Sequence, residues 1–287
     1  MQFPATNRIG DLITFTKSEL SSLYDAREAG SIAFLLAGEV LGKSKADLIM
    51  QSEDRINQSE LLKCMQHLEK LKTGMPVQYV LGYAWFYEMK FIVNAVVLIP
   101  RPETEELVKL IINEANHSAK RLLDIGTGSG CIAIALKKNI SECKVYASDF
   151  SQAALEVAKR NAANNDVVVD FLQADILKNK PDDCGLFDII VSNPPYIPVS
   201  ENENMHENVT RYEPDTALFV PDDDPLIFYR AIAEYALKFL TDHGTLYFEI
   251  HENFGESCIL MLQESGFLRI EMIRDINGKY RIIKACR

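Results

Sequence analysis

A short apolar strand that runs directly into three closely spaced glycines is the feature that most restricts how this chain can fold. Residues 121–125 lead into Gly126, Gly128 and Gly130, and an apolar helical segment follows at 132–136. Glycine adopts positive φ without strain and lets a ligand come close to the peptide plane. Strand, glycine turn and helix in this order are typical of an open α/β sheet, which binds its ligand at the carboxyl ends of the strands.

The spacing of the glycines also narrows the choice of ligand. A dinucleotide fingerprint reads G-x-G-x-x-G, whereas this turn reads G-x-G-x-G, and Cys131 stands where the last glycine of the fingerprint is expected. Pyrophosphate binding is therefore disfavoured as an interpretation of the turn.

Acidic side chains follow the next two predicted strands. A strand at 144–149 ends in Asp149, roughly 20 residues beyond the glycines, the separation at which a carboxylate can hold both hydroxyls of a ribose. A strand at 167–172 is followed by Asp175 and Ile176. Together they predict an adenosine site, with the ribose on Asp149, the adenine edge on Asp175 and the adenine face on Ile176. Taken singly, each acid could equally be a helix N-cap.

A rigid polar turn follows the strand predicted at 187–192. It reads Asn193, Pro194, Pro195, Tyr196. The prolines fix φ and lack backbone donors, so the carbonyls around them stay free to accept hydrogen bonds from a ligand. The asparagine amide and the flat tyrosine face complete a site suited to a planar group that bears an NH2. The tetrapeptide alone could also be a turn that merely ends the strand.

The remaining segments predict a parallel sheet preceded by a helical bundle. The first 75 residues carry apolar stripes at helical spacing and no alternating pattern. Aromatic and β-branched residues dominate 77–98, which indicates a β-hairpin. Strands and helices alternate from residue 122 onward, so we expect a doubly wound α/β sheet. The other predicted elements are a helix at 104–116, a helix at 225–240, a strand at 244–250, a helix at 254–264 and a final antiparallel hairpin of strands at 268–274 and 280–285.

The combination of motifs resembles the glutamine N5-methyltransferases that modify peptide chain release factors. The motifs are LIPRPETE at 98–105, DIGTGSG at 124–130, the strand end at Asp149, VSNPPYI at 191–197 and RYEP at 211–214. The glycine turn is shared with S-adenosylmethionine-dependent methyltransferases in general. The asparagine-proline-proline-tyrosine turn is shared with enzymes that methylate amino groups of nucleic acids. The combination of these two turns with LIPRPETE at 98–105 and RYEP at 211–214 is what resembles the enzymes that methylate glutamine in proteins.

The resemblance implies a class I methyltransferase, with a Rossmann-like, mostly parallel sheet and three parts. A helical domain at 1–75 docks the protein substrate, a β-hairpin at 76–100 is the linker, and 101–287 form the catalytic domain. The implied cofactor is S-adenosyl-L-methionine, with S-adenosyl-L-homocysteine as product. The cofactor-binding residues expected on these grounds are Asp124, Gly126, Thr127, Gly128, Ser129, Gly130, Asp149, Asp175, Ile176 and Asn193.

Catalysis then falls to the polar turn, whose four residues we expect to bind the substrate. The Asn193 side-chain oxygen and the Pro194 carbonyl would each accept one N–H of the substrate amide. This raises electron density on the amide nitrogen and aims its lone pair at the methyl group. Tyr196 would pack on the amide plane, and Pro195 would keep the turn stiff.

Five neighbouring positions carry further expectations. Arg101 and Glu103 could be solvent charges at the start of a helix, whereas the resemblance places them near the cofactor, where they would shape the active site. Glu249 and His251, at the end of a late strand, could serve as acid/base groups, but the pattern favours a strand-end carboxylate and a surface histidine. Ile176 stands where family members often have an aromatic residue that packs on adenine, so the apolar contact is kept in a different form.

The distribution of charge favours a protein target. The formal net charge is −11, and residues 198–224, the acidic segment, contain one cation, Arg211. Nucleic acids are bound largely by basic side chains that neutralise phosphates, so we expect no direct nucleic-acid partner. An acidic segment suits a protein target with a basic surface, and the resemblance implies that this target is a release factor. A solvated loop that serves solubility would have the same composition. The carboxylates of the segment are Glu201, Glu203, Glu207, Glu213, Asp215, Asp222, Asp223 and Asp224.

Two other functions use parts of the same pattern. A methyltransferase acting on exocyclic amines of DNA or RNA would use the same turn at 193–196, together with a basic groove. A non-catalytic nucleotide-binding module would bind adenosine at 126–130 without needing Asn193.

Compartment and metal content follow from what the sequence lacks. The six cysteines show no C-x-x-C pair and no companion histidine spacing, so we expect no metal and no disulfide framework. No secretion signal and no membrane-length apolar run is present, so we expect a cytoplasmic protein with no membrane partner.

Overall fold

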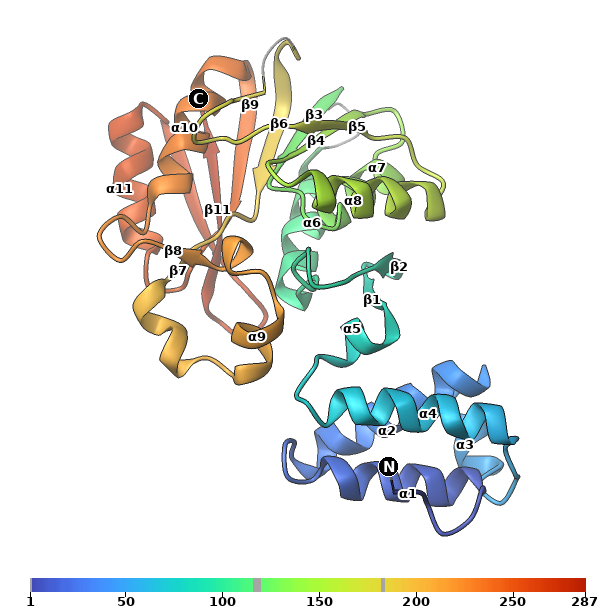
Figure 1. The fold of residues 1–287 in the computed structure, drawn as a ribbon. Helices are drawn as coiled ribbons and strands as arrows, with labels where there is room; N and C mark the ends of the chain where they lie inside the picture. Colours follow the sequence, from blue (N-terminus) through green and yellow to red (C-terminus); the bar gives the residue numbers. More distant parts are fainter. Residues whose placement is uncertain (1, 116–119, 182–183) are drawn as a thin grey trace. The chain divides into compact units, whose positions relative to one another are not determined.

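The computed structural model describes residues 2–115, 120–181 and 184–287, and these form two compact units. One unit contains the chain up to Gly82 together with His206–Tyr212, and the other contains Tyr83–Met205 and Glu213–Arg287. Figure 1 shows a helical unit and a unit built on a large sheet. Two positions used in the sequence-based expectations, Met1 and Asn116, lie outside the described residues.

The first unit is a bundle of helices, as its apolar stripes predict. Its helices are α1 (Ile9–Leu20), α2 (Ala26–Leu41), α3 (Lys45–Met50), α4 (Gln58–Leu71), α5 (Val77–Leu81) and α9 (Glu207–Tyr212). Capping boxes begin α3 at Ser44 and α4 at Asn57, and Gly42 ends α2 in the left-handed region at φ 63°. The apolar faces of α1 to α5 meet in one hydrophobic cluster.

A late segment of the chain belongs to this helical unit. In α9, the Tyr212 hydroxyl donates to the Thr73 carbonyl at 2.8 Å, and the Asn208 side chain donates to the Tyr24 hydroxyl at 3.2 Å. The acidic segment is therefore not a single free loop, because part of it is packed on helices near the start of the chain.

The β-hairpin is shorter than the 77–98 stretch predicted for it. Val77–Leu81 is a helix that ends at Gly82 with φ 81°, and the hairpin is β1 (Tyr83–Phe86) paired antiparallel with β2 (Met89–Ile92). The prediction failed because aromatic and β-branched residues also fit a single buried helical turn. The hairpin turn places Tyr87 and Glu88 at positive φ, the backbone that two-residue hairpins use.

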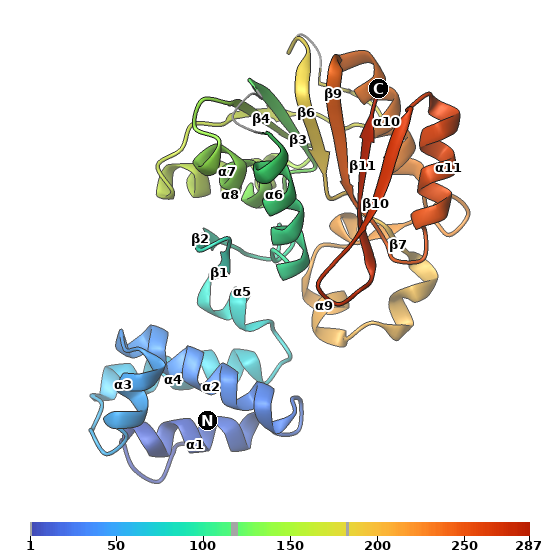
Figure 2. The same cartoon turned by 180° about the vertical axis from the view of Figure 1, so that it is seen from behind.

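The second unit is a seven-stranded sheet, and this confirms the predicted fold class. The strand order is β10-β11-β9-β6-β3-β4-β5, with β11 antiparallel to both neighbours and the other pairs parallel. Figure 2 shows the long C-terminal hairpin at one edge of the sheet. The strands are β3 (Arg121–Ile125), β4 (Lys144–Asp149), β5 (Asp170–Gln173), β6 (Phe187–Ser192), β9 (Leu240–Glu249), β10 (Arg269–Arg274) and β11 (Tyr280–Cys286).

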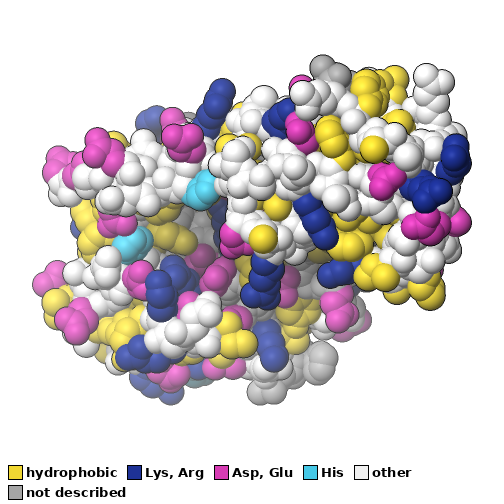
Figure 3. Space-filling view, turned by 90° about the horizontal axis from the view of Figure 1, so that it is seen from below, with side chains coloured by type: hydrophobic (Ala, Val, Ile, Leu, Met, Phe, Trp, Pro, Cys, Tyr) yellow, Lys and Arg dark blue, Asp and Glu magenta, His cyan; other side chains and the backbone are white. Residues whose placement is uncertain are grey.

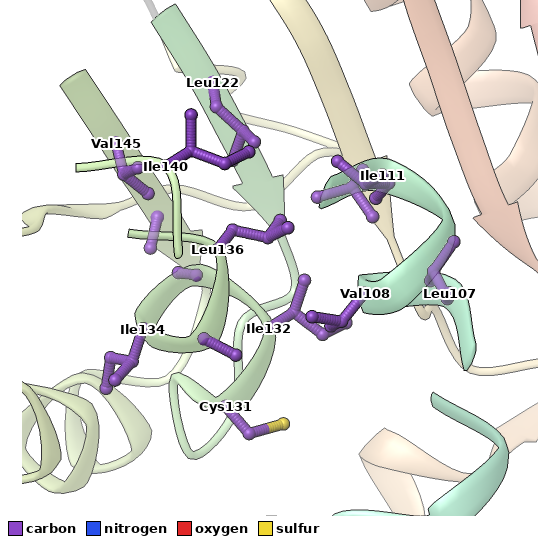
Figure 4. Close-up of a cluster of buried hydrophobic side chains, with 14 of the residues drawn as sticks. Leu107, Val108, Ile111, Leu122, Cys131, Ile132, Ile134, Leu136, Ile140 and Val145 are labelled. Carbon is purple, nitrogen blue, oxygen red and sulfur yellow. The ribbon is translucent and has the colours of Figure 1, made fainter. Parts of the chain in front are cut away.

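Helices cover both faces of this sheet. On one face pack α6 (Pro102–Ala115), α7 (Cys131–Asn139) and α8 (Gln152–Asn164); on the other pack α10 (Ile227–Phe239) and α11 (Gly255–Ser265). Figure 4 shows α6 and α7 in contact through Val108 and Ile132, with Leu136 above them. Every strand at the centre of the sheet is thus buried on both sides, which explains the continuous apolar runs in the sequence.

The order of the strands creates a switch point between β3 and β6. From β3 the chain continues to β4 and β5 on one side, and it then returns to place β6 on the other side of β3. Ile125 and Ser192, the last residues of β3 and β6, are paired, and the Ser192 hydroxyl donates to the Ile125 carbonyl at 2.7 Å. In open α/β sheets the crevice at such a point is where ligands bind.

The segment after β6 is closed by a small two-stranded sheet. It consists of β7 (Ile197–Pro198) and β8 (Phe219–Val220), paired in parallel. The short 3₁₀ helices η1 (Val199–Asn204) and η2 (Asp215–Ala217) lie between these strands in the sequence. Both ends of the acidic segment therefore belong to the second unit.

Candidate active site

A cavity of about 450 Å³ opens at the carboxyl edge of the sheet, at the switch point. Its volume lies in the range of small-molecule sites, roughly 300–1,000 Å³. The glycine turn after β3, the end of β4, residues 174–178 after β5 and the polar turn after β6 all line it. The four predicted site segments are therefore brought together on one cavity.

The glycines of the turn serve two different purposes. A Cβ added at Gly126 or Gly128 would meet no atom within 4 Å, and both glycines line the cavity. A Cβ at Gly130 would lie 2.9 Å from Ile134 Cδ1 and 3.1 Å from Ala158 Cβ. The first two glycines thus leave room for a ligand, whereas Gly130 is required for close packing of α7 against α8.

The base of the turn contains a fully buried carboxylate. Asp124, in β3, accepts a hydrogen bond from the Thr127 hydroxyl at 2.6 Å, and its Oδ1 has no hydrogen-bond partner among the described residues. Burial raises the pKa of the Asp124 carboxyl to about 7, against the opposing effect of the Thr127 hydrogen bond. Ser129 lines the cavity, and its carbonyl accepts from the Asn161 side chain at 2.9 Å.

We expect the buried Asp124 to make the free protein less stable as pH rises toward neutrality. Its pKa is higher in the folded chain than in the unfolded chain, so the folded state binds the additional proton between about pH 4 and pH 7. Stability therefore falls as pH rises through this window and levels off above it, by up to about 4 kcal/mol in total. Asp124→Asn should remove this slope, which urea unfolding of both proteins from pH 5 to pH 8 would measure. Parallel curves for the two proteins would show that the carboxyl titrates normally.

Asp149 connects the end of β4 to the glycine turn. Its Oδ2 accepts the Gly128 amide and its Oδ1 accepts the Ser151 amide, each at 2.9 Å. Burial raises the pKa of the Asp149 carboxyl, and the backbone N–H donors act in the opposite direction. The side chain is only 6% exposed and lines the cavity, so its remaining lone pairs face a restricted space.

The part of the cavity predicted for adenine contains an aromatic residue that the sequence analysis missed. Asp175 and Ile176 line the cavity as expected, and Asp175 Oδ1 accepts the Leu177 amide at 2.9 Å. Phe150 also lines it, with 52% of its surface exposed. The position of Phe150 directly after the strand-end Asp149 was the available signal in the sequence, because residues at the carboxyl ends of parallel strands meet at the ligand-binding edge.

Three of the four residues of the polar turn line the cavity: Asn193, Pro194 and Pro195. The Asn193 side-chain nitrogen lies 3.3 Å from the Thr104 hydroxyl oxygen. Tyr196 packs against the cluster under α10 and α11, and its hydroxyl donates to Glu249 Oε1 at 3.2 Å. The amide-packing role expected for Tyr196 stays a prediction.

Glu249 lies at the end of its strand as predicted, but it is also buried and accepts hydrogen bonds from two side chains next to the cavity. It is the last residue of β9, it is 1% exposed, and it accepts from the Thr104 hydroxyl at 2.6 Å as well as from Tyr196. Thr104 belongs to the first turn of α6 and lines the cavity. His251, expected at the surface, is buried and lies 3.3 Å from Glu201.

One carboxylate of the acidic segment is paired inside the second unit and is not part of a solvated rim. The Glu213 side chain is 1% exposed, and it accepts from Arg101 at 2.6 Å and from the Ile99 amide at 3.1 Å. Arg101 lines the cavity, as the resemblance implied. The pair ties the segment that precedes α6 to the segment that follows α9.

Removing Arg101 should destabilise the second unit more than neutralising its partner. Arg101→Met leaves the buried Glu213 carboxylate without its cation, which costs roughly 3 kcal/mol of unfolding free energy. Glu213→Gln removes the charge and keeps an acceptor for the Ile99 amide, so its loss should be about half as large. Urea titrations at pH 7.5 would compare the two, and equal losses would contradict a desolvated pair.

Charges of both signs are mixed on one face of the molecule. Figure 3 shows Lys and Arg side chains interspersed with Asp and Glu over the face drawn there. No group of three or more His, Cys, Asp or Glu in the described ranges is placed to hold a metal ion, and metal independence stays a prediction. Within the same ranges, no helix has the length and apolarity needed to cross a membrane.

The strand order, the antiparallel β11 and the site at the switch point define a class I methyltransferase. Solved structures share this fold: the Thermus thermophilus 16S rRNA N2 G1207 methyltransferase in complex with AdoMet and guanosine has a TM-score of 0.52 at 16% identity over 71% of this chain and 49% of that chain. The catalytic domain of human Mettl16, in complex with a MAT2A 3'UTR hairpin, has a TM-score of 0.55 at 14% identity over 80% and 81%. At these identities the likeness concerns the fold alone.

Sequence comparison is more specific. The model for the methyltransferase small domain matches residues 104–211, and that for the PrmC N-terminal domain matches 11–82. The release factor glutamine methyltransferase of Bacteroides thetaiotaomicron is 41% identical over 96% of this chain and 99% of its own length. That of Flavobacterium psychrophilum is 41% identical over 92% and 94%. The chain belongs to the release factor glutamine methyltransferase family.

Proposed function

We propose that this protein methylates the side-chain amide nitrogen (N5) of a glutamine in peptide chain release factors, using S-adenosyl-L-methionine. Family membership over nearly the whole length of the relatives supports the substrate. The observation that carries the chemistry is that Asn193 and Pro194 line the same cavity as the glycine turn and Asp149. An acceptor amide at the polar turn would thus lie in the same cavity as the methyl donor.

The residues around the cavity fit S-adenosyl-L-methionine. Gly126 and Gly128 leave space beside the backbone, and Asp124 Oδ1 is a buried acceptor with no hydrogen-bond partner in the described part of the chain. We assign the amino acid part of the cofactor to the turn at 126–130, with Thr127 and Ser129 as polar contacts. Gly130 then supports this site by allowing α7 to pack against α8. Asp124 supports it by accepting the hydrogen bond of the Thr127 hydroxyl beneath the turn.

We assign the adenosine part to the ends of β4 and β5. Asp149 would hold the ribose hydroxyls, Asp175 the adenine edge, and Ile176 and Phe150 the two adenine faces. Phe150 then supplies the aromatic contact that Ile176 does not, since flat rings stack favourably on aromatic side chains.

The chemical task of the polar turn is to make an amide nitrogen nucleophilic. When bound, the cofactor supplies an electrophilic methyl group on a sulfonium. The Asn193 side-chain oxygen and the Pro194 carbonyl would accept the two N–H groups of the substrate amide and orient its lone pair. Orientation of reacting groups recovers about 7–11 kcal/mol of barrier. Pro195 would keep the turn stiff, and Tyr196 anchors the end of the turn through its hydrogen bond to Glu249.

The helical unit is the proposed docking site for the release factor. It matches the PrmC N-terminal domain, and it includes α9 from the middle of the acidic segment. The cytoplasm is the proposed compartment, because release factors act in translation.

Direct methylation of nucleic acid is the second function to test, since two solved neighbours of the same fold are an rRNA methyltransferase and a catalytic domain in complex with a 3'UTR hairpin. Incubation with radiolabelled cofactor and separately purified release factor, tRNA, rRNA and DNA would separate the candidates. We expect label in the release factor only, at one glutamine located by mass spectrometry. A release factor with that glutamine changed to glutamate is the matched control. Label in nucleic acid alone would overturn the proposal, and bound cofactor without any transfer would indicate a binding module.

A further inference from the structure

Two parts of the second unit that are distant in sequence converge on a buried carboxylate carried by a third. Thr104 in α6 and Tyr196 after β6 both donate hydrogen bonds to Glu249, the last residue of β9. Thr104 is also the hydrogen-bond partner of the Asn193 amide nitrogen. Thr104 and Asn193 line the cavity, whereas Glu249 lies behind them and does not line it.

The single hydroxyl proton of Thr104 determines which end of the Asn193 amide, oxygen or NH2, points toward Thr104. A threonine hydroxyl has one proton, and here Thr104 donates it to Glu249 at 2.6 Å. Toward Asn193 the Thr104 oxygen can then only accept, so it takes the NH2 end of the amide at 3.3 Å. The Asn193 oxygen is thereby turned away from Thr104, and no donor among the described side chains and amides holds it.

The direction of these hydrogen bonds depends on the protonation state of Glu249. Burial raises the pKa of this carboxyl, and the hydrogen bonds from Thr104 and Tyr196 and the nearby Arg281 charge act against the rise. Burial also raises the pKa of the Tyr196 hydroxyl well above its usual range, so this group keeps its proton and remains a donor to Glu249. Above its raised pKa the Glu249 carboxyl is ionised, has no proton to give and can only accept.

We propose that Glu249 and Thr104 are positioning residues that select the catalytic orientation of the Asn193 amide, with its oxygen toward the substrate. This rests on the proposed function, because it specifies how the Asn193 oxygen becomes the acceptor for a substrate amide N–H. The last torsion of asparagine is broad and roughly two-fold, so the side chain alone does not choose between its two ends. With the NH2 end inward, two donors would face each other and the substrate amide would be misaligned.

Exchanging single groups would test the order of the network. Glu249→Gln places an NH2 where a carboxylate oxygen was, so it can donate to Thr104, whose proton then turns to Asn193 and favours the reversed amide. Thr104→Val keeps the shape and removes the hydroxyl, whereas Thr104→Ser keeps the hydroxyl. We expect kcat to fall about 10- to 100-fold in the first two variants, the size of one misdirected hydrogen bond, and to stay within about three-fold in the serine variant.

A purely structural brace would give a different pattern. We expect the Kd for S-adenosyl-L-homocysteine and the KM for release factor to stay within about three-fold of wild type in all three variants, with the double variant Glu249→Gln/Thr104→Val no worse than either single one. Tyr247→Phe is the matched control, since it removes a buried hydroxyl that donates to Glu114 at 2.6 Å from the same strand. Loss of activity that follows the melting temperature alone, in this control as well, would contradict the proposal.

A spectroscopic measurement makes the test independent of the acceptor. In the cofactor-free protein labelled with ¹⁵N-asparagine, the Asn193 side-chain NH2 should give a hydrogen-bonded signal that Thr104→Ser keeps and Thr104→Val shifts or broadens. An Asn193 signal unchanged in Thr104→Val would overturn the positioning role whatever the activity. Failure of the wild-type protein to methylate release factor, with the expected shift in the NH2 signal, would instead count against the proposed function alone.

Discussion

Asn193→Ala should lower kcat for methyl transfer by about 10²–10³-fold, the loss expected when one preorganised hydrogen-bonding group of a transition state is removed. The variant keeps the glycine turn, Asp149 and Phe150, which carry the proposed cofactor contacts. Its affinity for cofactor should therefore stay within about five-fold of wild type. A five-fold change in Kd corresponds to no more than the free energy of one hydrogen bond. Single-turnover transfer to purified release factor and calorimetry with S-adenosyl-L-homocysteine would measure the two quantities.

The control for this substitution is another asparagine of the same unit. Asn164 is exposed and is the last residue of α8, and Asn164→Ala should leave transfer unchanged. Turnover of Asn193→Ala at the wild-type rate would show that the polar turn does not grip the acceptor amide. A parallel loss of cofactor affinity would show that Asn193 acts mainly on the methyl donor.

Asp149→Ala should weaken cofactor binding by about 100-fold or more, because two hydrogen bonds to a charged acceptor are lost. The carboxylate has a second effect, since it accepts the Gly128 and Ser151 amides and so holds the glycine turn against the end of β4. Calorimetry with S-adenosyl-L-homocysteine and the dependence of rate on cofactor concentration would report the loss. At saturating cofactor, kcat should recover to within about ten-fold of wild type, because the acceptor side of the site is intact.

A surface carboxylate provides the comparison. Glu156 lies on α8 and forms an exposed pair with Lys159, so Glu156→Ala should leave both binding and rate unchanged. If Asp149→Ala bound cofactor as tightly as this control, the ribose would have to be held elsewhere in the cavity. If both variants lost affinity equally, a general effect of charge on the cofactor would be the explanation.

The elements that could be predicted are those with a local signal. The parallel strands are buried on both faces, so β3, β4 and β6 read as short apolar runs, and turn chemistry marked their ends at Gly126 and Asn193. The segment at 77–81 was assigned to a hairpin because residue type there did not distinguish a buried turn of helix from a strand. Glu213 read as a surface acid because its partner Arg101 is 112 residues away.

The same distinction applies inside the site. Asp149, Asp175 and Asn193 were predictable because each follows a strand, and the carboxyl ends of parallel strands meet at one edge. Phe150 was overlooked although it is next to Asp149, because exposure is not visible in a single sequence. Glu249 was placed at a strand end, but its burial and its link to Thr104 depend on packing of β9 against α6.

By itself, the sequence determined the sheet with its glycine turn and polar turn, the family, and through it the reaction that we propose. These follow from periodicity, φ requirements and short motifs, all of which act within a few residues of each other. Only the tertiary structure decided that Gly130 serves packing while Gly126 and Gly128 face the cavity, and that a buried carboxylate orders the hydrogen bonds around Asn193. The direction of a hydrogen bond depends on which donors and acceptors the folded chain brings together, and residues 145 positions apart have no local pattern that reveals it.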